Sequence, residues 1–256
     1  MKKSLLASAL TCTTALFLLS APYHANANDM QSAHWGYEGA EGPEHWGELK
    51  EDFGTCATGH TQSPINITAT AHEDLPDIHL EYKDGPLSIV NNGHTVQVNV
   101  PEGSNMTIDG TVYHLLQFHF HTPSENKIEG KQYPMEMHLV HKTDDGKLGV
   151  LAVMIEEGSE NPVYDKFWSK MPEHAGEPEE LANVTLNPLD LLPEDKHYYH
   201  FMGSLTTPPC SEGVNWHVLE TPIQLSKEQI EHFQKLFPMN ARPVQPANDR
   251  AVVMDE

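Results

Sequence analysis

Two segments of this chain combine histidines with apolar residues at every second position. The first is Gln-Phe-His-Phe-His at 117–121, and the second is Met-Glu-Met-His-Leu-Val-His at 135–141. An alternation with a period of two predicts a β-strand, because residues two apart in a strand point to the same face. His119 and His121 therefore share one face of their strand, while the phenylalanines beside them face an apolar core. In the second strand, His138 points away from the neighbouring methionines in the same way.

Three histidines on two strands predict a metal site. Three neutral imidazoles with a fourth position left open form the typical ligand set of a catalytic zinc ion. A metal-bound histidine almost always donates its second ring N–H to an acceptor that fixes its tautomer. Gln117 shares a face with His119, and Glu136 shares a face with His138, so each strand supplies such an acceptor. We therefore predict that His119, His121 and His138 bind Zn²⁺.

Two other interpretations of these histidines are weaker. The chain has 17 histidines, and an isolated one is usually a solvated or locally hydrogen-bonded side chain. His119, His121 and Glu125 also match the His-x-His-x3-Glu core of a cupin metal site. That motif has glycines at the positions where Tyr113 and Gln132 stand here. A second strand with a third histidine and a carboxylate on the same face favours the three-histidine site.

The N-terminus has the features of an export signal. Two lysines precede an apolar stretch at 5–19, and the Ala-Asn-Ala tripeptide at 25–27 has the small-x-small pattern of a cleavage site. The stretch is interrupted by Ser and Thr and lacks stop-transfer charges, so we expect a removed signal rather than a membrane anchor. The predicted signal peptide is 1–27, the predicted single domain is 28–256, and the expected location is periplasmic or secreted.

Removal of the signal leaves two cysteines, Cys56 and Cys210. In an exported protein, an even number of cysteines predicts a disulfide. The alternative is two unrelated thiols. A bridge would close a loop of about 150 residues and stabilise the fold by about 4–5 kcal/mol in the chain-entropy description.

The chain is strongly acidic, which limits its partners. It has 37 Asp and Glu residues against 15 Lys and Arg, and loss of two lysines with the signal takes the formal charge from −22 to −24. Such a charge disfavours nucleic acids and anionic membrane surfaces as partners. We therefore expect no nucleic-acid partner and no membrane anchor in the processed protein.

Short apolar runs separated by Pro, Gly and Asn predict a sheet-rich fold. One helix is expected to open at Asn161-Pro162 and continue to Trp168, and a second spans Lys227–Leu236 with Ser226 as its N-cap. We predict a mainly β fold, a single domain built on a large, mostly antiparallel central sheet with a few short peripheral helices. The expected strands are Ile78–Tyr82, Leu87–Asn91, Thr95–Val100, Val112–His121, Glu136–His141, Leu148–Ile155, Tyr198–Gly203 and Val214–Leu219.

Five further strings of residues are informative as a set. They are Trp35-Gly36-Tyr37, Pro43-Glu44-His45-Trp46, Gln62-Ser63-Pro64-Ile65-Asn66-Ile67, Asn91-Asn92-Gly93-His94 and Ser204-Leu205-Thr206-Thr207-Pro208-Pro209-Cys210. Together with the histidine strands, they closely resemble the α-class carbonic anhydrases, over about 34–250. The signal, the paired cysteines and the compact loops resemble the bacterial, exported branch of that family.

The resemblance implies roles for the residues around the metal. The three histidines match the zinc ligands of the family. Gln117 and Glu136 match the acceptors that support His119 and His138, in agreement with strand alternation. Asn240 matches the residue whose backbone carbonyl supports the middle ligand, His121.

The resemblance also implies how substrate is held. Thr206 matches the threonine that accepts a hydrogen bond from zinc-bound hydroxide and donates one to a glutamate, here Glu125. Thr207 matches a second threonine near bound bicarbonate. The apolar wall where carbon dioxide rests is matched by Val140, Val153, Leu205, Val214 and Trp216. His217 stands where the family usually has an aliphatic residue.

His94 matches the proton shuttle of the family. A proton that leaves a water of pKa about 7 directly for bulk solvent is limited to roughly 10³ per second, so fast turnover requires an intermediate group of similar pKa. Tyr37, Asn92 and Gln97 match the polar residues that order the connecting waters. Thr95 stands where the family usually has a small residue, and Gln97 stands where it usually has an asparagine. The resemblance therefore does not predict the speed of proton transfer in this chain.

The resemblance therefore implies a zinc-dependent lyase that reversibly hydrates carbon dioxide to bicarbonate and a proton. Zinc-bound hydroxide attacks the substrate, and His94 then removes the proton. The alternatives are a non-catalytic carbonic-anhydrase-like binding module and a zinc hydrolase acting on esters. Retention of the three histidines with Thr206 and Glu125 argues against the first, and ester hydrolysis is expected as a side reaction. Exported bacterial relatives are often dimers, so the resemblance allows a homodimer.

Overall fold

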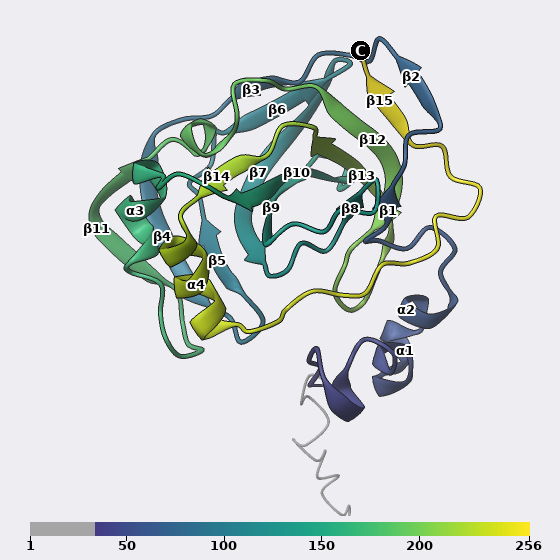
Figure 1. Ribbon diagram of the computed structural model, residues 1–256, viewed down its shortest axis with the longest axis horizontal. Helices are drawn as coiled ribbons and strands as arrows, with labels where there is room; N and C mark the ends of the chain where they lie inside the picture. The colour runs from purple at the N-terminus through teal and green to yellow at the C-terminus, as the bar shows by residue number, and fades with distance from the viewer. Residues whose placement is uncertain (1–33) are drawn as a thin grey trace, which may run out of the picture. The chain divides into compact units, whose positions relative to one another are not determined.

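The structure is a computed structural model, and it describes residues 34–256. The predicted signal peptide at 1–27 lies outside the described residues. A mixed sheet of 13 strands organises the described part of the chain (Figure 1). The main path of this sheet runs in the order β11, β4, β5, β7, β9, β10, β13, β12, β15 and β2.

Most of the central strands of the sheet have seven or more residues, and most neighbours are antiparallel. Their bounds are β4 Gly85–Asn91, β5 Val96–Asn99, β7 Thr111–His121, β9 Met135–Lys142, β10 Leu148–Glu157, β12 Tyr198–Ser204 and β13 Glu212–Leu219. The outer strands are β2 Ala71–Glu73, β3 His79–Glu81, β6 Asn105–Ile108, β11 Glu179–Leu186, β14 Ile223–Leu225 and β15 Val253–Asp255. Parallel pairs join β10 to β13 and β14, and β15 to β2. A separate two-stranded sheet pairs β1 (Asn66–Ile67) with β8 (Lys127–Ile128).

All eight expected strands are present, with end positions that differ by one or two residues. The mainly β fold is therefore confirmed. The helices are short: α1 Trp46–Leu49, α2 Thr55–Thr58, α3 Pro162–Trp168 and α4 Lys227–Leu236. Short 3₁₀ helices cover Gly39–Glu41, Glu51–Phe53 and Pro188–Leu191. Within residues 34–256, none of the helices has the length and apolar character needed to cross a membrane.

Both predicted helix starts are confirmed by their caps. The Ser226 hydroxyl accepts a hydrogen bond from Gln229 N, and the Gln229 side chain accepts one from the backbone of Ser226, so α4 opens with a complete capping box. The Asn161 side chain accepts from Val163 N at the start of α3, with proline in the first turn. Both helices lie on one side of the sheet (Figure 1).

An apolar cluster lies on each face of the sheet. On one face, Phe118 and Phe120 of β7 pack against Phe167 of α3, and Phe120 also packs against Phe233 of α4. On the other face, the ring of Trp216 in β13 stacks on Phe201 of β12. The alternation of side chains in β7 therefore directs its phenylalanines into the helix-covered core and its histidines to the opposite face.

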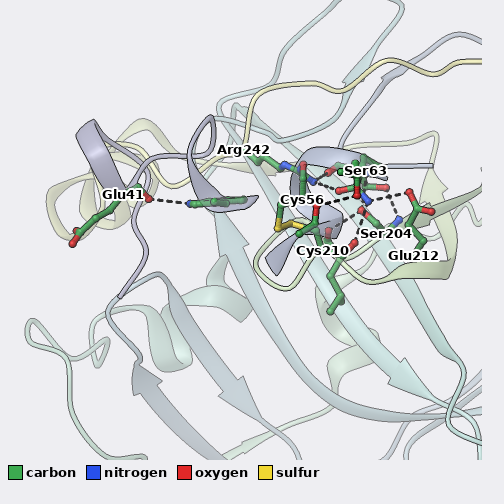
Figure 2. The surroundings of a disulfide bond; sticks show 12 residues. Glu41, Cys56, Ser63, Ser204, Cys210, Glu212 and Arg242 are labelled. Carbon is green, nitrogen blue, oxygen red and sulfur yellow. Dashed lines mark hydrogen bonds between the residues drawn. A yellow bond between two sulfur atoms is a disulfide. The ribbon is translucent and has the colours of Figure 1, made fainter. Parts of the chain in front are cut away.

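The predicted disulfide between Cys56 and Cys210 is confirmed (Figure 2). It joins α2 to the loop that follows β12, across a sequence separation of 154 residues. Closing a loop of that length stabilises the folded state by about 5 kcal/mol in the chain-entropy description. The bridge therefore anchors the loop that carries Thr206 and Thr207.

Candidate metal centre and its surroundings

Two neighbouring strands bring the three predicted ligands together. β7 and β9 are antiparallel, with His119 directly opposite His138 and His121 opposite Glu136. One ring nitrogen from each histidine lies within 4.8 Å of the corresponding atoms of the other two. His121 and His138 are buried, and His119 is partly exposed. Strand pairing therefore produces a three-histidine group that is open on one side.

The second ring nitrogens of the two β7 histidines are held by acceptors. His119 Nδ1 lies 2.8 Å from Gln117 Oε1, and His121 Nδ1 lies 2.8 Å from the carbonyl oxygen of Asn240. Because both acceptors take a proton from Nδ1, the Nε2 atoms of these rings carry free lone pairs. The structure thus brings Gln117 and Asn240 to the positions expected from the sequence.

His138 is held differently, through Nε2. That atom lies 3.0 Å from Glu136 Oε1. Glu136 is fully buried, and it accepts hydrogen bonds from Asn126 N at 2.8 Å and Asn126 Nδ2 at 2.7 Å. Burial raises the pKa of Glu136, but His138 and the donors of Asn126 outweigh it, so the pKa is lowered overall. An ionised Glu136 directs Nδ1 of His138 toward the other two rings.

The residues of this group fit a metal ion. His121 Nε2 is buried and has no hydrogen-bond partner. Burial lowers the pKa of His119 and His121, and for His119 the two neighbouring imidazoles lower it further. Neutral imidazoles with convergent lone pairs are the form that binds a divalent metal. The donor set is therefore Nε2 of His119, Nε2 of His121 and Nδ1 of His138.

Glu125 and Thr206 lie beside the three histidines. Glu125 is fully buried, with Oε2 at 3.4 Å from His121 Nε2, and its Oε1 accepts a hydrogen bond from Arg242 N at 2.8 Å. Burial raises the pKa of Glu125 to about 7, although His138, Arg242 N–H and the Thr206 hydroxyl oppose the rise. Glu125 Oε2 has no well-formed donor, so it is the oxygen available to the Thr206 hydroxyl.

Arg242 is a site residue that the sequence analysis missed. Its guanidinium is almost fully buried and donates to Gln62 Oε1, Ser63 O and Cys56 O, next to the disulfide (Figure 2). Its backbone N–H binds Glu125, so it connects the disulfide region to the metal surroundings. The Arg-Pro pair after Asn240-Ala241 was visible in the sequence, but nothing local indicated that the arginine would be buried.

An apolar wall lies on the face of the sheet that carries the three histidines. The prediction that Val153 belongs to it is wrong. The cluster on this face includes Val140, Val150, Leu205, Val214 and Trp216. The Trp216 ring meets His138 edge-on at 5.0 Å. Val153 instead lies in the cluster on the opposite face. Ala152 pairs with His138, and Val150 with Val140, so alternation turns Val153 away from the site. Val150 takes the place expected for Val153.

The residues expected along a proton path are near the site but have additional partners. His94 lies in the turn between β4 and β5, and its ring stacks on Trp35 with centroids 3.7 Å apart. Burial, and to a lesser extent His34, lowers the pKa of His94. Burial and the charge of Glu125 raise the pKa of Tyr37 well above its usual value.

Two of these expected path residues use their amides within the protein. Asn92 Oδ1 accepts hydrogen bonds from His94 N and Thr95 N, both at 3.0 Å, so it stabilises the turn. Gln97 Nε2 donates to Asn99 Oδ1 at 2.7 Å. These contacts leave each side chain with one further polar atom for solvent.

Three convergent imidazoles on a β-sheet define a candidate metalloenzyme, and comparison with known proteins identifies the family. Residues 41–256 match the family model of eukaryotic-type carbonic anhydrases. A carbonic anhydrase of Pectobacterium atrosepticum is 46% identical over 237 residues, covering 92% of this chain and 96% of that protein. A carbonic anhydrase of Klebsiella pneumoniae is 50% identical over 226 residues, covering 87% and 91%.

The solved structures agree. A hyperthermostable carbonic anhydrase from a hydrothermal vent chimney superposes with a TM-score of 0.84 at 48% identity, covering 87% of this chain and all of that one. The α-carbonic anhydrase of Photobacterium profundum gives a TM-score of 0.81 at 48% identity, covering 86% and 100%. The chain therefore belongs to the α-class, eukaryotic-type carbonic anhydrase family.

Proposed function

We propose that this chain is a zinc enzyme that catalyses the reversible hydration of carbon dioxide to bicarbonate and a proton. The observation that carries the proposal is the convergence of three imidazole nitrogens within 4.8 Å of one another, beside an apolar wall. Zinc held by His119, His121 and His138 would lower the pKa of a water to about 7 and so supply hydroxide at neutral pH.

The chain's own residues would orient that hydroxide and the substrate. The Thr206 hydroxyl has a single proton, and Glu125 is the acceptor beside it. Once Thr206 donates to Glu125, it can only accept from the hydroxide, which turns a lone pair toward the substrate carbon. The wall around Val140, Val150 and Trp216 suits a substrate with no net dipole and excludes competing water. Thr207, next in the chain, would contact the bicarbonate product.

We further propose that the mature enzyme is a single domain, 28–256, made with a signal peptide at 1–27 and exported to the periplasm or beyond. The disulfide supports this proposal, because such bridges persist in oxidising compartments. The strong negative charge supports a protein without nucleic-acid partners. By analogy with exported bacterial relatives, the enzyme is proposed to form a homodimer.

The decisive experiment compares zinc-loaded with chelator-stripped protein in stopped-flow hydration of carbon dioxide. We expect activity in the loaded protein, background rates in the stripped protein, and recovery with Zn²⁺ but not with Mg²⁺, which prefers oxygen ligands. Equal background rates in both samples would contradict the proposal. Hydrolysis of an activated ester by the same samples, without hydration of carbon dioxide, would support the ester hydrolase instead.

His94 is proposed to relay the proton from the metal centre to buffer. In His94→Ala, we expect kcat in weak buffer to fall by at least about tenfold, because a positioned acid–base group is lost. The ratio kcat/KM should change little, since it reports the steps before proton release. Added imidazole should restore kcat. An unchanged kcat in weak buffer would show that protons leave by another route.

A further inference from the structure

We propose that Thr95 and the side chain of Asn240 are positioning residues that hold the His94 turn against the metal-ligand strand. They bind the turn to the backbone of Phe120, the residue between His119 and His121. This inference rests on the proposed function, because it assigns the two residues to the proton-transfer step. It concerns side-chain hydrogen bonds rather than the support that the Asn240 carbonyl gives to His121.

The Thr95 hydroxyl makes the first connection. Thr95 is buried, and its Oγ1 donates to Phe120 O at 2.5 Å and accepts from Phe120 N at 3.3 Å. The regular pairing of β5 with β7 ends where Gln97 faces His119. Beyond that pair, the Thr95 side chain binds the residue before β5 to β7, the strand that carries His119 and His121. A small apolar residue at this position could not make either hydrogen bond.

The Asn240 amide makes the second connection. Asn240 is fully buried, and its Nδ2 donates to His94 O and Phe120 O, each at 3.0 Å. Its Oδ1 accepts from Thr122 N at 2.7 Å. The carbonyl of the same residue accepts from His121 Nδ1. A single asparagine therefore contacts the backbone of His94 and the ring of a predicted metal ligand.

The turn itself is internally well defined. Asn92 Oδ1 caps it, and Gly93 adopts a φ of +88°, a conformation that favours glycine. The turn can consequently move as one body, and its position relative to the metal centre depends on where it is attached. Proton transfer through ordered water is sensitive to that position, because misplacement of a catalytic group by about 1 Å can cost up to about 100-fold in rate.

The test compares Thr95→Val, which removes the hydroxyl at nearly constant shape, with Thr95→Ser, which keeps it. We expect Thr95→Val to lower kcat in weak buffer about three- to tenfold while kcat/KM stays within about twofold. Imidazole should restore kcat, and Thr95→Ser should retain most of the wild-type value.

A matched control exists at the far edge of the sheet. The Thr70 hydroxyl donates to Val252 O and accepts from Val252 N, both at 3.1 Å, so it makes the same two kinds of contact as Thr95. Thr70→Val removes this pair without touching the His94 turn. Its kcat should equal that of the wild type. Thr70 is exposed and Thr95 is buried, so the free energy of unfolding of both valine variants should be measured beside kcat, and Thr70→Val should be the less destabilised.

A second readout does not depend on activity. In NMR spectra of the zinc-free protein, the His94 ring should show contacts with the Trp35 ring on which it stacks. We expect these contacts to weaken in Thr95→Val and to persist in Thr95→Ser and Thr70→Val. The spectra remain informative even if zinc-loaded wild-type protein fails to hydrate carbon dioxide, which would overturn the proposed function by itself.

Three results would overturn the inference. The first is a Thr95→Val variant with wild-type kcat and wild-type ring contacts. The second is a parallel fall of kcat and kcat/KM, which would mean that Thr95 supports the metal centre rather than the position of His94. The third is a Thr95→Ser variant as impaired as Thr95→Val, which would assign the effect to the methyl group and to packing.

Discussion

Replacement of Thr206 by valine is expected to lower kcat/KM for hydration of carbon dioxide by about 100-fold, the usual cost of losing one oriented hydrogen bond at a reacting oxygen. Thr206 is buried beside Glu125, whose Oε2 has no well-formed donor among the described residues. Valine removes both the donor to Glu125 and the acceptor for the attacking hydroxide. Stopped-flow kinetics on protein of verified zinc content would measure the loss.

Thr207→Val is the matched control for this prediction. Thr207 is the next residue, it is less buried, and its backbone carbonyl accepts from Cys210 N whatever its side chain. We expect a fall in kcat/KM of less than about tenfold, because this hydroxyl would contact product rather than orient the nucleophile. If both variants lost the same activity, the orientation role assigned to Thr206 would be wrong.

The placement of the three histidines could be predicted because it depends on local alternation. Residues two apart in any strand share a face, so His119, His121 and the acceptor Gln117 follow once β7 is a strand. Which face of β10 meets the site depends instead on the register of β10 with β9. No local sequence pattern indicates that register. Val150 and Val153 are three residues apart, lie on opposite faces, and look equally suitable as apolar residues.

The side-chain partners of Arg242 and Asn240 were also beyond prediction. The Asn92 amide caps its own turn, a local contact that the Asn-Gly pair suggests. Arg242 binds residues near the disulfide and also Glu125, and the Asn240 side chain reaches His94 and Phe120. These contacts require the C-terminal segment to cross the sheet next to β7, which only the assembled fold specifies.

Replacement of His217 by isoleucine is expected to make the fold more resistant to acid. His217 is 1% exposed, its Nδ1 has no hydrogen-bond partner, and its ring lies 5.3 Å from those of Tyr198 and His200. Burial, together with His200 and His141, lowers the pKa of His217 to about 3. The resemblance to the family predicted an aliphatic residue here, and the structure instead buries an imidazole.

The direction of the effect follows from the two pKa values. In the unfolded chain His217 binds a proton below about pH 6.5, whereas in the folded protein it stays neutral until about pH 3. Its contribution to stability is therefore complete above pH 6.5 and is lost as the pH falls toward 3, at about 1.4 kcal/mol per pH unit. Isoleucine removes this loss, which amounts to about 2.7 kcal/mol at pH 4.5, and suits a buried strand.

Urea unfolding of the metal-free proteins at pH 8 and pH 4.5 would measure the effect without a contribution from acid release of metal. The free energy of unfolding of His217→Ile should fall less between the two pH values than that of the wild type. The difference should equal the contribution of the single titrating group that the substitution removes. The dependence should not vanish, because burial also lowers the pKa of His141 to about 3. Leu219→Ile, on the same face of β13, changes packing without changing a titrating group and should keep the wild-type pH dependence. A His217→Ile variant as acid-sensitive as the wild type would mean that His217 is charged in the folded protein, and that its neighbours stabilise the charge.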